Sequence, residues 1–316
     1  MRVLITGIEG FVGRHLAREL SGAGHSVYGL YYDPGDIAEV GDIASGLYRG
    51  DVRDGAGFAE ILNNTGPDAV IHLAAMSFVP VATAKPLSAW NINLGGTLNL
   101  LEWIRKYAPQ AELLFVSTSE VYGRPAEGDL PYTEATPLRP ENMYAATKAS
   151  ADLAVDRYRA LYGIPAVIIR PSNHIGPGQS EDFVASSFAR QAAEAALGLS
   201  DGIIRVGNLS ARRDFLDVRD VVRGYRIALE NGLSGIFNLG AGRGIEIRGI
   251  LDKLVEISGA DIDVEVDPER LRPVDVPLVE VSHGKFEEKT GWRPEIPLEK
   301  SLTDTFEWWK EKLQKQ

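Results

Sequence analysis

The sequence contains no cysteine, so the chain can form neither disulfide bonds nor thiolate metal sites. It also lacks any uninterrupted apolar run close to the roughly 20 residues that a membrane-spanning helix requires. Its opening residues are typical of a buried strand and not of the basic and apolar segments of a secretory signal peptide. These absences favour a cytoplasmic protein that does not insert into a membrane.

Positive charge is also in short supply, since 33 Lys and Arg residues face 44 Asp and Glu residues and give a formal net charge of −11. This balance opposes binding to nucleic acid or to an anionic membrane surface. The few histidines do not have the spacing of a metal site: His15, His25, His72, His174 and His283. We therefore expect a small-molecule ligand that is held by local hydrogen-bond donors, and no bound metal.

Short apolar runs, by contrast, are frequent and alternate with helical patterns. The strand-like runs are Arg2–Thr6, Ser26–Leu30, Ala69–Leu73, Leu113–Ser117, Ala166–Arg170 and Ile236–Leu239. The helical patterns are Val12–Leu20, Ala56–Asn63, Thr97–Tyr107, Tyr144–Leu161 and Val218–Asn231. Strands that are apolar throughout and alternate with helices indicate a parallel sheet covered on both faces. The predicted fold is therefore α/β, with a Rossmann-type doubly wound sheet.

Glycine and proline become frequent from about Pro171 onward, where the alternation is interrupted. A helix over Asp182–Gly198 and short strands near Ile203–Val206 and Val264–Val266 are predicted there. We interpret this part as a smaller, discontinuous α/β substrate-binding domain. The predicted boundaries are 1–170 together with 215–243 for the dinucleotide-binding domain, and mainly 171–214 and 244–316 for the smaller domain.

Gly7, Gly10 and Gly13 form a G-x-x-G-x-x-G pattern between the first strand and the first helix. Glycine permits a tight turn and lets backbone N–H groups approach a pyrophosphate at the positive end of a helix. The pattern has the context that a dinucleotide site requires, because it follows a strand and opens an amphipathic helix. Turn glycines without a ligand are the alternative interpretation.

The end of the second strand should indicate which cofactor is bound. An acidic residue there would bind the ribose 2′-hydroxyl, whereas a basic residue would favour a 2′-phosphate. Asp33 follows Gly13 by twenty residues, and no basic residue is adjacent to it, which favours NAD without excluding NADP. Asp51 and Val52 would serve the adenine edge, although a polar turn explains them equally well.

Tyr144 and Lys148 stand four residues apart on a predicted helix and therefore share one face. Acid–base work at neutral pH requires a lowered tyrosine pKa, and a neighbouring ammonium group helps to lower it. Alone, the two residues are equally typical of a surface pair. Thr118 changes this balance, because it follows the predicted strand Leu113–Ser117 at the end where ligands of open α/β sheets bind. The three residues together predict a catalytic site.

On these motifs the sequence resembles the extended short-chain dehydrogenases/reductases over nearly its whole length. The resemblance implies that Thr118, Tyr144 and Lys148 are the catalytic set, that the cofactor is NADP or NAD, and that Asn93 supports the lysine region. The implied cofactor-binding residues are Gly7, Gly10, Phe11, Val12, Gly13, Tyr31, Asp33, Asp51, Val52, Leu73, Ala74, Ala75, Asn93, Tyr144 and Lys148. Relatives that use NAD often carry Asp where this chain has Tyr31, so both cofactors stay open.

The segment from Arg170 to Pro177 matches the R-x-x-N-x-x-G-P pattern of the nucleotide-sugar branch of this family. The resemblance implies that Asn173, Arg213 and Arg272 bind a diphosphate, since arginine forks suit phosphate oxygens. The implied substrate-binding residues are Ser77, Asn173, His174, Val206, Asn208, Arg213 and Arg272.

Within that branch the sequence is most similar to the GDP-4-keto-6-deoxymannose reductases. The resemblance implies reduction of the C4 ketone of GDP-4-keto-6-deoxy-D-mannose by NAD(P)H to a GDP-6-deoxyhexose such as GDP-D-rhamnose. Glu120 is a base in the dehydratase reading, so GDP-mannose 4,6-dehydratase stays an alternative, as do a nucleotide-sugar 4-epimerase and a non-catalytic dinucleotide sensor. Family members commonly form homodimers through a four-helix bundle, here built from Thr97–Tyr107 and Tyr144–Leu161.

Overall fold

The computed structural model describes residues 1–35, 37–270 and 276–315, and its centre is one parallel sheet. Seven strands follow the order β11-β6-β5-β4-β1-β2-β3, and every neighbouring pair is parallel. The strands are β1 (Arg2–Thr6), β2 (Ser26–Tyr31), β3 (Gly46–Arg49), β4 (Ala69–His72), β5 (Glu112–Val116), β6 (Ala166–Pro171) and β11 (Gly235–Leu239). The predicted Rossmann-type sheet is confirmed, and the six listed strand ranges agree with the observed ends to within one residue.

The order of the strands fixes where a ligand should bind. From β1 the chain adds β2 and β3 on one side, and it then continues on the other side of β1 with β4, β5, β6 and β11. The direction reverses between β1 and β4. Ligands of open α/β sheets bind in the crevice outside the carboxyl ends of the strands at such a reversal.

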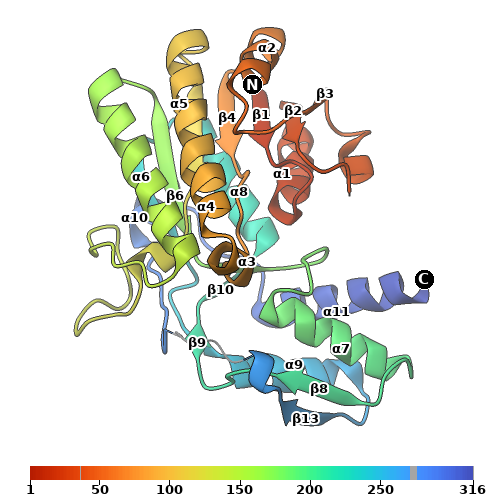
Figure 1. The fold of residues 1–316 in the computed structure, drawn as a ribbon. Helices are drawn as coiled ribbons and strands as arrows, with labels where there is room; N and C mark the ends of the chain where they lie inside the picture. The colour runs from red at the N-terminus through yellow and green to blue at the C-terminus, as the bar shows by residue number, and fades with distance from the viewer. Residues whose placement is uncertain (36, 271–275, 316) are drawn as a thin grey trace.

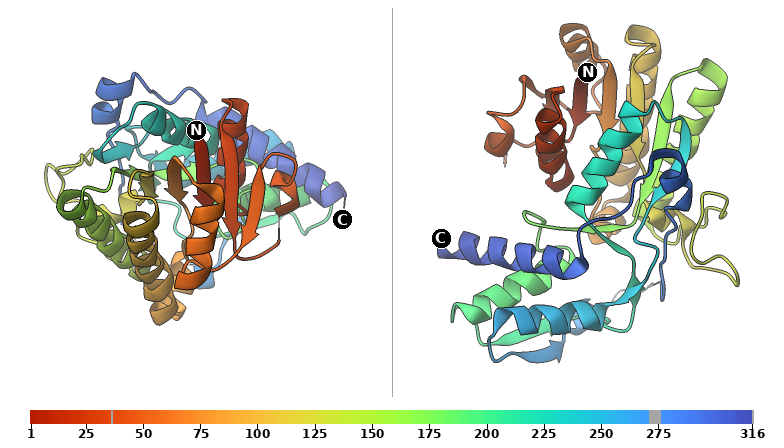
Figure 2. Two further views of the ribbon diagram at one scale, coloured as in Figure 1. Left: turned by 90° about the horizontal axis from the view of Figure 1, so that it is seen from above. Right: turned by 180° about the vertical axis from the view of Figure 1, so that it is seen from behind.

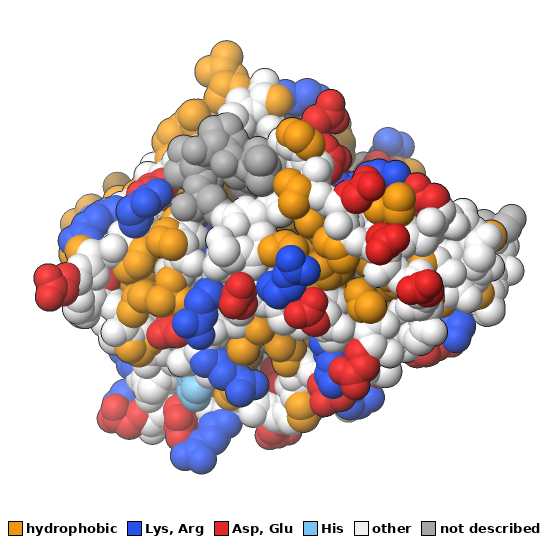
Figure 3. Space-filling model, turned by 90° about the horizontal axis from the view of Figure 1, so that it is seen from below, with side chains coloured by type: hydrophobic (Ala, Val, Ile, Leu, Met, Phe, Trp, Pro, Cys, Tyr) orange, Lys and Arg blue, Asp and Glu red, His pale blue; other side chains and the backbone are white. Residues whose placement is uncertain are grey.

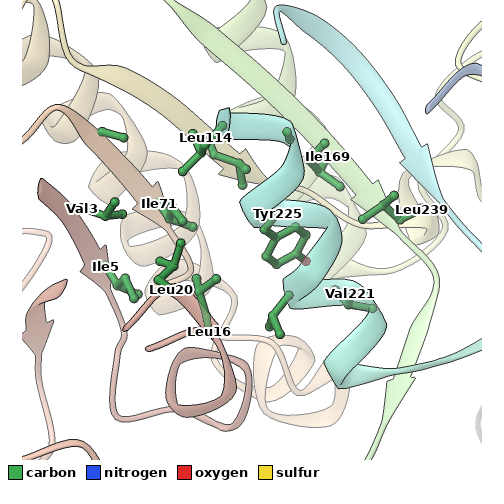
Figure 4. Close-up of a cluster of buried hydrophobic side chains, with 14 of the residues drawn as sticks. Val3, Ile5, Leu16, Leu20, Ile71, Leu114, Ile169, Val221, Tyr225 and Leu239 are labelled. Carbon is green, nitrogen blue, oxygen red and sulfur yellow. The ribbon is translucent and has the colours of Figure 1, made fainter. Parts of the chain in front are cut away.

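Helices cover both faces of the sheet (Figure 1). One face carries α1 (Phe11–Gly22) and α8 (Val218–Glu230), and the other carries α2 (Gly55–Thr65), α5 (Gly96–Tyr107) and α6 (Met143–Tyr162). Figure 4 shows the core under α1 and α8, where side chains from both helices meet strand residues: Val3, Ile5, Leu16, Leu20, Ile71, Leu114, Ile169, Val221, Tyr225 and Leu239. A buried Leu, Ile or Val contributes roughly 1.5–3 kcal/mol, which explains why these strands are apolar throughout.

The remaining elements form a smaller lobe beyond the carboxyl end of the sheet (Figures 1 and 2). Its helices share a separate apolar core and have a parallel two-stranded sheet beside them. These elements are α7 (Val184–Ala196), α9 (Ile247–Ser258), α11 (Leu298–Gln314), β8 (Ile203–Val206) and β13 (Asp263–Val266). The Trp309 indole donates to the hydroxyl of Ser186 at 2.9 Å and joins α11 to α7. The exact domain boundaries stay a prediction.

Short pairs of strands connect the two lobes. They are the parallel pair β7 (Asn173–Ile175) and β10 (Phe215–Asp217) and the antiparallel pair β9 (Arg212–Arg213) and β12 (Ile245–Glu246). Arg14 of α1 donates to the carbonyl of Gly178 at 3.0 Å, and the His15 ring lies 2.9 Å from the carbonyl of Pro177. The first loop of the smaller lobe is therefore fixed against α1, beside the glycine turn.

The surface agrees with the mixed composition of the chain. Among the helices that the structure describes, none combines the length and the apolar content needed to cross a membrane. On the underside of the smaller lobe, acidic and basic side chains alternate with apolar ones around the grey, undescribed residues (Figure 3). A face with such mixed charge does not attract a polyanion strongly.

Candidate active site

A cleft of about 1600 Å³ lies between the carboxyl end of the sheet and the smaller lobe. It extends from the glycine turn at Gly7, past Thr118 at the end of β5, to Asn208 and Arg213 of the smaller lobe. A typical small-molecule pocket has a volume of roughly 300–1,000 Å³. This cleft therefore has room for a dinucleotide and a second ligand.

The glycine turn brings backbone close to backbone. Gly7 has φ +75°, a conformation that other residues rarely adopt, and a Cβ on Gly13 would lie 2.7 Å from the Cα of Ile8. The next residues, Gly10, Phe11 and Val12, line the cleft at the start of α1, where no side chain of the described residues caps the helix. Uncapped N–H groups at a helix N-terminus suit a pyrophosphate. The turn therefore fits a dinucleotide.

The end of β2 differs from the sequence-based expectation. Tyr31, Asp51 and Val52 line the cleft as predicted, and hydrogen bonds from Arg53 hold the pKa of the Asp51 carboxyl below its usual range. Asp33, however, is exposed and lies outside the cleft. Its carboxylate accepts a hydrogen bond from the N–H of Gly35 at 3.1 Å, so it stabilises its own turn. The structure does not bring Asp33 to a ribose.

Asn93 also lies outside the cleft, and its contacts are structural. It is buried in the helical turn before α5, where its carbonyl accepts from the N–H of Met76 at 2.7 Å. Its amide donates to the hydroxyl of Thr147 at 2.8 Å. Leu73, Ala74 and Ala75 line the cleft just before Met76. Asn93 therefore fixes both the segment after β4 and the turn of α6 next to Lys148, without lining the cofactor space itself.

Tyr144 and Thr118 meet in the centre of the cleft through a hydrogen bond between their side chains. The hydroxyl of Thr118 also accepts from the N–H of Glu120 at 3.2 Å. Burial raises the pKa of the Tyr144 phenol well above its usual value, the charge of Glu120 raises it further, and the hydrogen bond with Thr118 lowers it in part. The phenol is therefore protonated at neutral pH, the opposite of the lowered pKa expected from the sequence.

Lys148 explains part of this difference. Its side chain is 4% exposed, its amine donates to the carbonyl of Val116 at 2.6 Å, and it lies 4.2 Å from the centre of the Phe115 ring. Burial lowers the pKa of Lys148 to about 7, although the charge of Asp152 opposes this shift. An amine that is half protonated at neutral pH, and that is engaged with Val116, cannot shift the tyrosine pKa as strongly as a full positive charge would.

Glu120 lies beside the Tyr144 hydroxyl and lines the same cleft. Its carboxylate accepts a hydrogen bond from the side-chain amide of Asn142 at 2.7 Å, and Asn142 caps the first turn of α6 by accepting from Ala145 N at 2.8 Å. The position of the carboxylate is therefore fixed by the start of the helix that carries Tyr144. The site combines a phenol, a hydroxyl, an amine and a carboxylate, which are suited to proton transfer.

The smaller lobe supplies most of the predicted substrate-binding residues. Those that line the cleft are Ser77, Asn173, His174, Asn208 and Arg213, with Ser77 contributed by the segment after β4. Burial lowers the pKa of His174 to about 4, so this ring is neutral at pH 7. Val206 is fully buried and lies outside the cleft, where its neighbours Gly207 and Asn208 take its place. Arg272 falls outside the described residues.

Several residues of the cleft were not predicted from the sequence: Glu9, Arg53, Asn142, Gln179 and Arg270. Glu9 lies inside the glycine pattern, and Asn142 is a strong N-cap type directly before the Tyr144 helix, so both had a signal in the sequence. Gln179 and Arg53 reach the cleft through the fold alone. Within the described ranges, no group of three His, Asp or Glu side chains is arranged to hold a metal ion.

A comparison with protein families supports this description of the site. A sequence profile of the GDP-mannose 4,6 dehydratase family matches residues 4–305. The matched segment contains the glycine turn, Thr118, Tyr144, Lys148 and the described substrate side of the cleft.

Similar proteins include reductases and epimerases. The chain is 34% identical to the GDP-6-deoxy-D-mannose reductase of Pseudomonas aeruginosa, over 100% of this chain and 99% of that protein. The solved structure of RMD from Pseudomonas aeruginosa complexed with NADPH covers 99% of this chain and 100% of its own, at 33% identity and a TM-score of 0.86. The UDP-glucose 4-epimerase of Thermus thermophilus in complex with NAD covers 98% and 99%, at 32% identity and a TM-score of 0.88.

Proposed function

Because the chain belongs to the GDP-mannose 4,6 dehydratase family of extended short-chain dehydrogenases/reductases, we propose that it reduces the C4 ketone of GDP-4-keto-6-deoxy-D-mannose. The protein is an NAD(P)-dependent oxidoreductase that acts on a nucleotide sugar. The product would be a GDP-6-deoxyhexose such as GDP-D-rhamnose. The full-length similarity to a GDP-6-deoxy-D-mannose reductase supports this substrate.

The protonated Tyr144 phenol is the observation that carries the choice of a reductase. Reduction of a ketone needs a proton donor from the start, because the carbonyl oxygen becomes an alkoxide. A dehydratase or an epimerase must first remove a proton from a sugar hydroxyl, and for that step a phenolate is required. Burial and the neighbouring Glu120 charge both disfavour the phenolate here.

The residues of the chain divide the proton chemistry among them. A bound nicotinamide cofactor supplies the hydride. Tyr144 gives its proton to the oxygen at C4, and Thr118 stabilises that oxygen and then the phenolate by donating a hydrogen bond. Thr118 can do so because its oxygen accepts from Glu120 N, which leaves its own O–H available. Lys148 lines the cleft beneath this pair and is placed to bind the ribose hydroxyls of the cofactor.

The GDP group would extend into the smaller lobe. Asn173 and Arg213, with Arg272 from outside the described residues, are assigned to the diphosphate, and Asn208 is assigned to the ribose or the base. The guanidinium of Arg270 lines the same end of the cleft. Ser77 and His174 are left for the sugar, where a neutral histidine can both donate and accept hydrogen bonds.

A dehydratase is the second candidate, and Glu120 is the observation that favours it. A carboxylate beside Tyr144 is suitably placed to remove a sugar C–H proton during loss of water. The matching family profile also carries the dehydratase name. An epimerase and a non-catalytic dinucleotide sensor are weaker alternatives, since the complete set of Thr118, Tyr144 and Lys148 is present.

The test compares two substrates with each reduced cofactor. Purified protein receives either GDP-mannose or its 4-keto-6-deoxy derivative, with NADH or NADPH, and the absorbance of the reduced nicotinamide is followed. We expect loss of absorbance with the keto sugar and no conversion of GDP-mannose. Tyr144→Phe should lower the rate by roughly 10²–10⁴-fold, with GDP-sugar binding retained. Conversion of GDP-mannose, or an unchanged rate in Tyr144→Phe, would reject the proposed reaction.

We further propose that the enzyme is a homodimer in which α5 and α6 form a four-helix bundle. Apolar side chains on α6 are exposed, with Leu153 at 55%, Leu161 at 71% and Tyr162 at 55%. Tyr107 at the end of α5 is 41% exposed. Analytical ultracentrifugation of the wild type and of Leu153→Glu tests this, and we expect a dimer and a monomer respectively. The predicted cytoplasmic location still rests on the absence of cysteine.

A further inference from the structure

Glu9 connects the glycine turn to the end of β2. One carboxylate oxygen accepts a hydrogen bond from the backbone N–H of Tyr32 at 2.9 Å. The other oxygen is shielded from solvent and has no hydrogen-bond partner among the described residues. The turn itself is held at this position, because the N–H groups of Gly7 and Ile8 donate to the carbonyl of Leu30 at 2.8 and 3.3 Å. A negative charge is thus fixed beside the last residues of β2.

This position is the one at which a Rossmann fold selects its cofactor. An acid at the end of the second strand normally accepts a hydrogen bond from the ribose 2′-hydroxyl and repels a 2′-phosphate. Asp33 does not occupy that place, since it is exposed and bonded to its own turn. Glu9 lines the cleft together with Tyr31 and Tyr32, and its carboxylate retains acceptor capacity.

We propose that Glu9 binds the adenosine ribose 2′-hydroxyl and excludes a 2′-phosphate, so that this protein prefers NAD(H) over NADP(H). The proposal rests on the proposed function only for its dinucleotide site. It separates this chain from the Pseudomonas aeruginosa structure that was solved with NADPH. A carboxylate in the glycine turn here takes the place of the acid at the strand end.

Arg53 is the residue that argues in the opposite direction, because it is a cation at the same end of the cleft. Its guanidinium is already committed to Asp51, with Nε 3.0 Å from both carboxylate oxygens and Nη2 at 2.5 Å from one of them. An arginine that binds a carboxylate in this bidentate way has most of its charge compensated. To bind a 2′-phosphate it would have to leave Asp51 and approach Glu9, an acidic neighbour.

The experiment measures binding of adenosine 5′-monophosphate and adenosine 2′,5′-bisphosphate by calorimetry at constant ionic strength, without any sugar substrate. The two probes differ only in the 2′-phosphate. The wild type should bind the monophosphate at least about 10-fold more tightly, because like charges at short range repel by a kilocalorie or more. Glu9→Gln should reduce this ratio by about 10-fold, since the amide oxygen can still accept from Tyr32 N while the charge is gone.

Asp33→Asn is the matched control, because it removes one acidic charge a short distance away and outside the cleft; its ratio should equal that of the wild type. Equal binding of both probes by the wild type, or an unchanged ratio in Glu9→Gln, would overturn the role of Glu9 alone. Tighter binding of the bisphosphate that is lost in Arg53→Met would assign the selection to Arg53 and also overturn the proposal. Binding of neither probe would refute the dinucleotide site, and with it the proposed function.

Discussion

Two successive turns of α6 bury charge in opposite ways. Lys148 has a carbonyl oxygen and an aromatic ring as partners, and no carboxylate of the described residues lies within ion-pair distance of its amine. One turn later, Asp152 accepts from both Nε and Nη2 of Arg170 at 2.8 Å each. Arg170 also donates to the hydroxyl of Tyr122 at 3.1 Å. One charge is isolated and the other is paired on every side.

The difference separates a charge that serves chemistry from a charge that serves the fold. The pKa of Lys148 falls to about 7 because burial penalises its ammonium form. Hydrogen bonds and the charge of Asp152 instead raise the pKa of Arg170, although burial opposes them. Perturbed ionisable groups of the first kind collect in active sites, whereas satisfied pairs are structural. Because both residues contact one helix, substitutions can test the distinction directly.

The largest expected effect is on folding. Arg170→Met removes the partner of Asp152 and leaves a carboxylate buried without compensation, so the free energy of unfolding should fall by about 3–5 kcal/mol. Urea unfolding followed by circular dichroism measures this loss. Arg159→Met is the matched control, because Arg159 pairs with Asp156 at the surface of the same helix, and such pairs contribute about 0–1 kcal/mol. Equal losses in the two variants would show that the buried pair is no more important than an exposed one.

Lys148→Met should have the opposite profile. Loss of a preorganised donor in an active site typically lowers turnover by roughly 10²–10³-fold, and we expect a fall of this size in reduction of the keto sugar. Folding should not suffer at pH 7, because methionine fills a similar volume without a buried ammonium group. Rate measurements and urea unfolding on the same preparation test both halves. A rate close to that of the wild type, or a large loss of stability, would remove the contrast with Arg170.

The same lysine should make stability depend on pH. The pKa of Lys148 is about 7 in the folded protein against 10.5 ordinarily, so between these values the unfolded chain holds a proton that the folded chain has released. The free energy of unfolding therefore rises with pH in this window, by about 2 kcal/mol from pH 7 to pH 9. Urea titrations at both pH values should show this rise in the wild type and in Lys106→Met, an exposed control, but not in Lys148→Met. Parallel behaviour of all three proteins would place the lysine pKa near its ordinary value.

The fold could be predicted because each strand of the main sheet is buried on both faces and is therefore apolar throughout. The glycine turn, Thr118 and Tyr144 could be placed together for a related reason, since the carboxyl ends of parallel strands meet at one edge. The sequence does not encode strand order in the same way: β11 joins β6 from more than sixty residues away.

Side-chain direction is what the sequence could not supply. Counting residues from the glycine turn led to Asp33, but its carboxylate turns back to Gly35 N, while Glu9 reaches Tyr32 N from the turn itself. The pKa of Tyr144 was misjudged for a similar reason. Its direction depends on burial and on Glu120, which a separate segment of chain brings beside the phenol.

The smallest predicted effect concerns Asn142, which contributes to the fold and to the site at once. Its side chain caps α6 at Ala145 N and also donates to Glu120. Asn142→Ala should lower the free energy of unfolding by about 1 kcal/mol, and Asn142→Ser should restore most of it through the hydroxyl cap. Serine is too short to replace the amide bond to Glu120, so the rate should stay reduced in both variants. If serine restored rate and stability together, the link to Glu120 would have no role, and helix capping alone would account for Asn142.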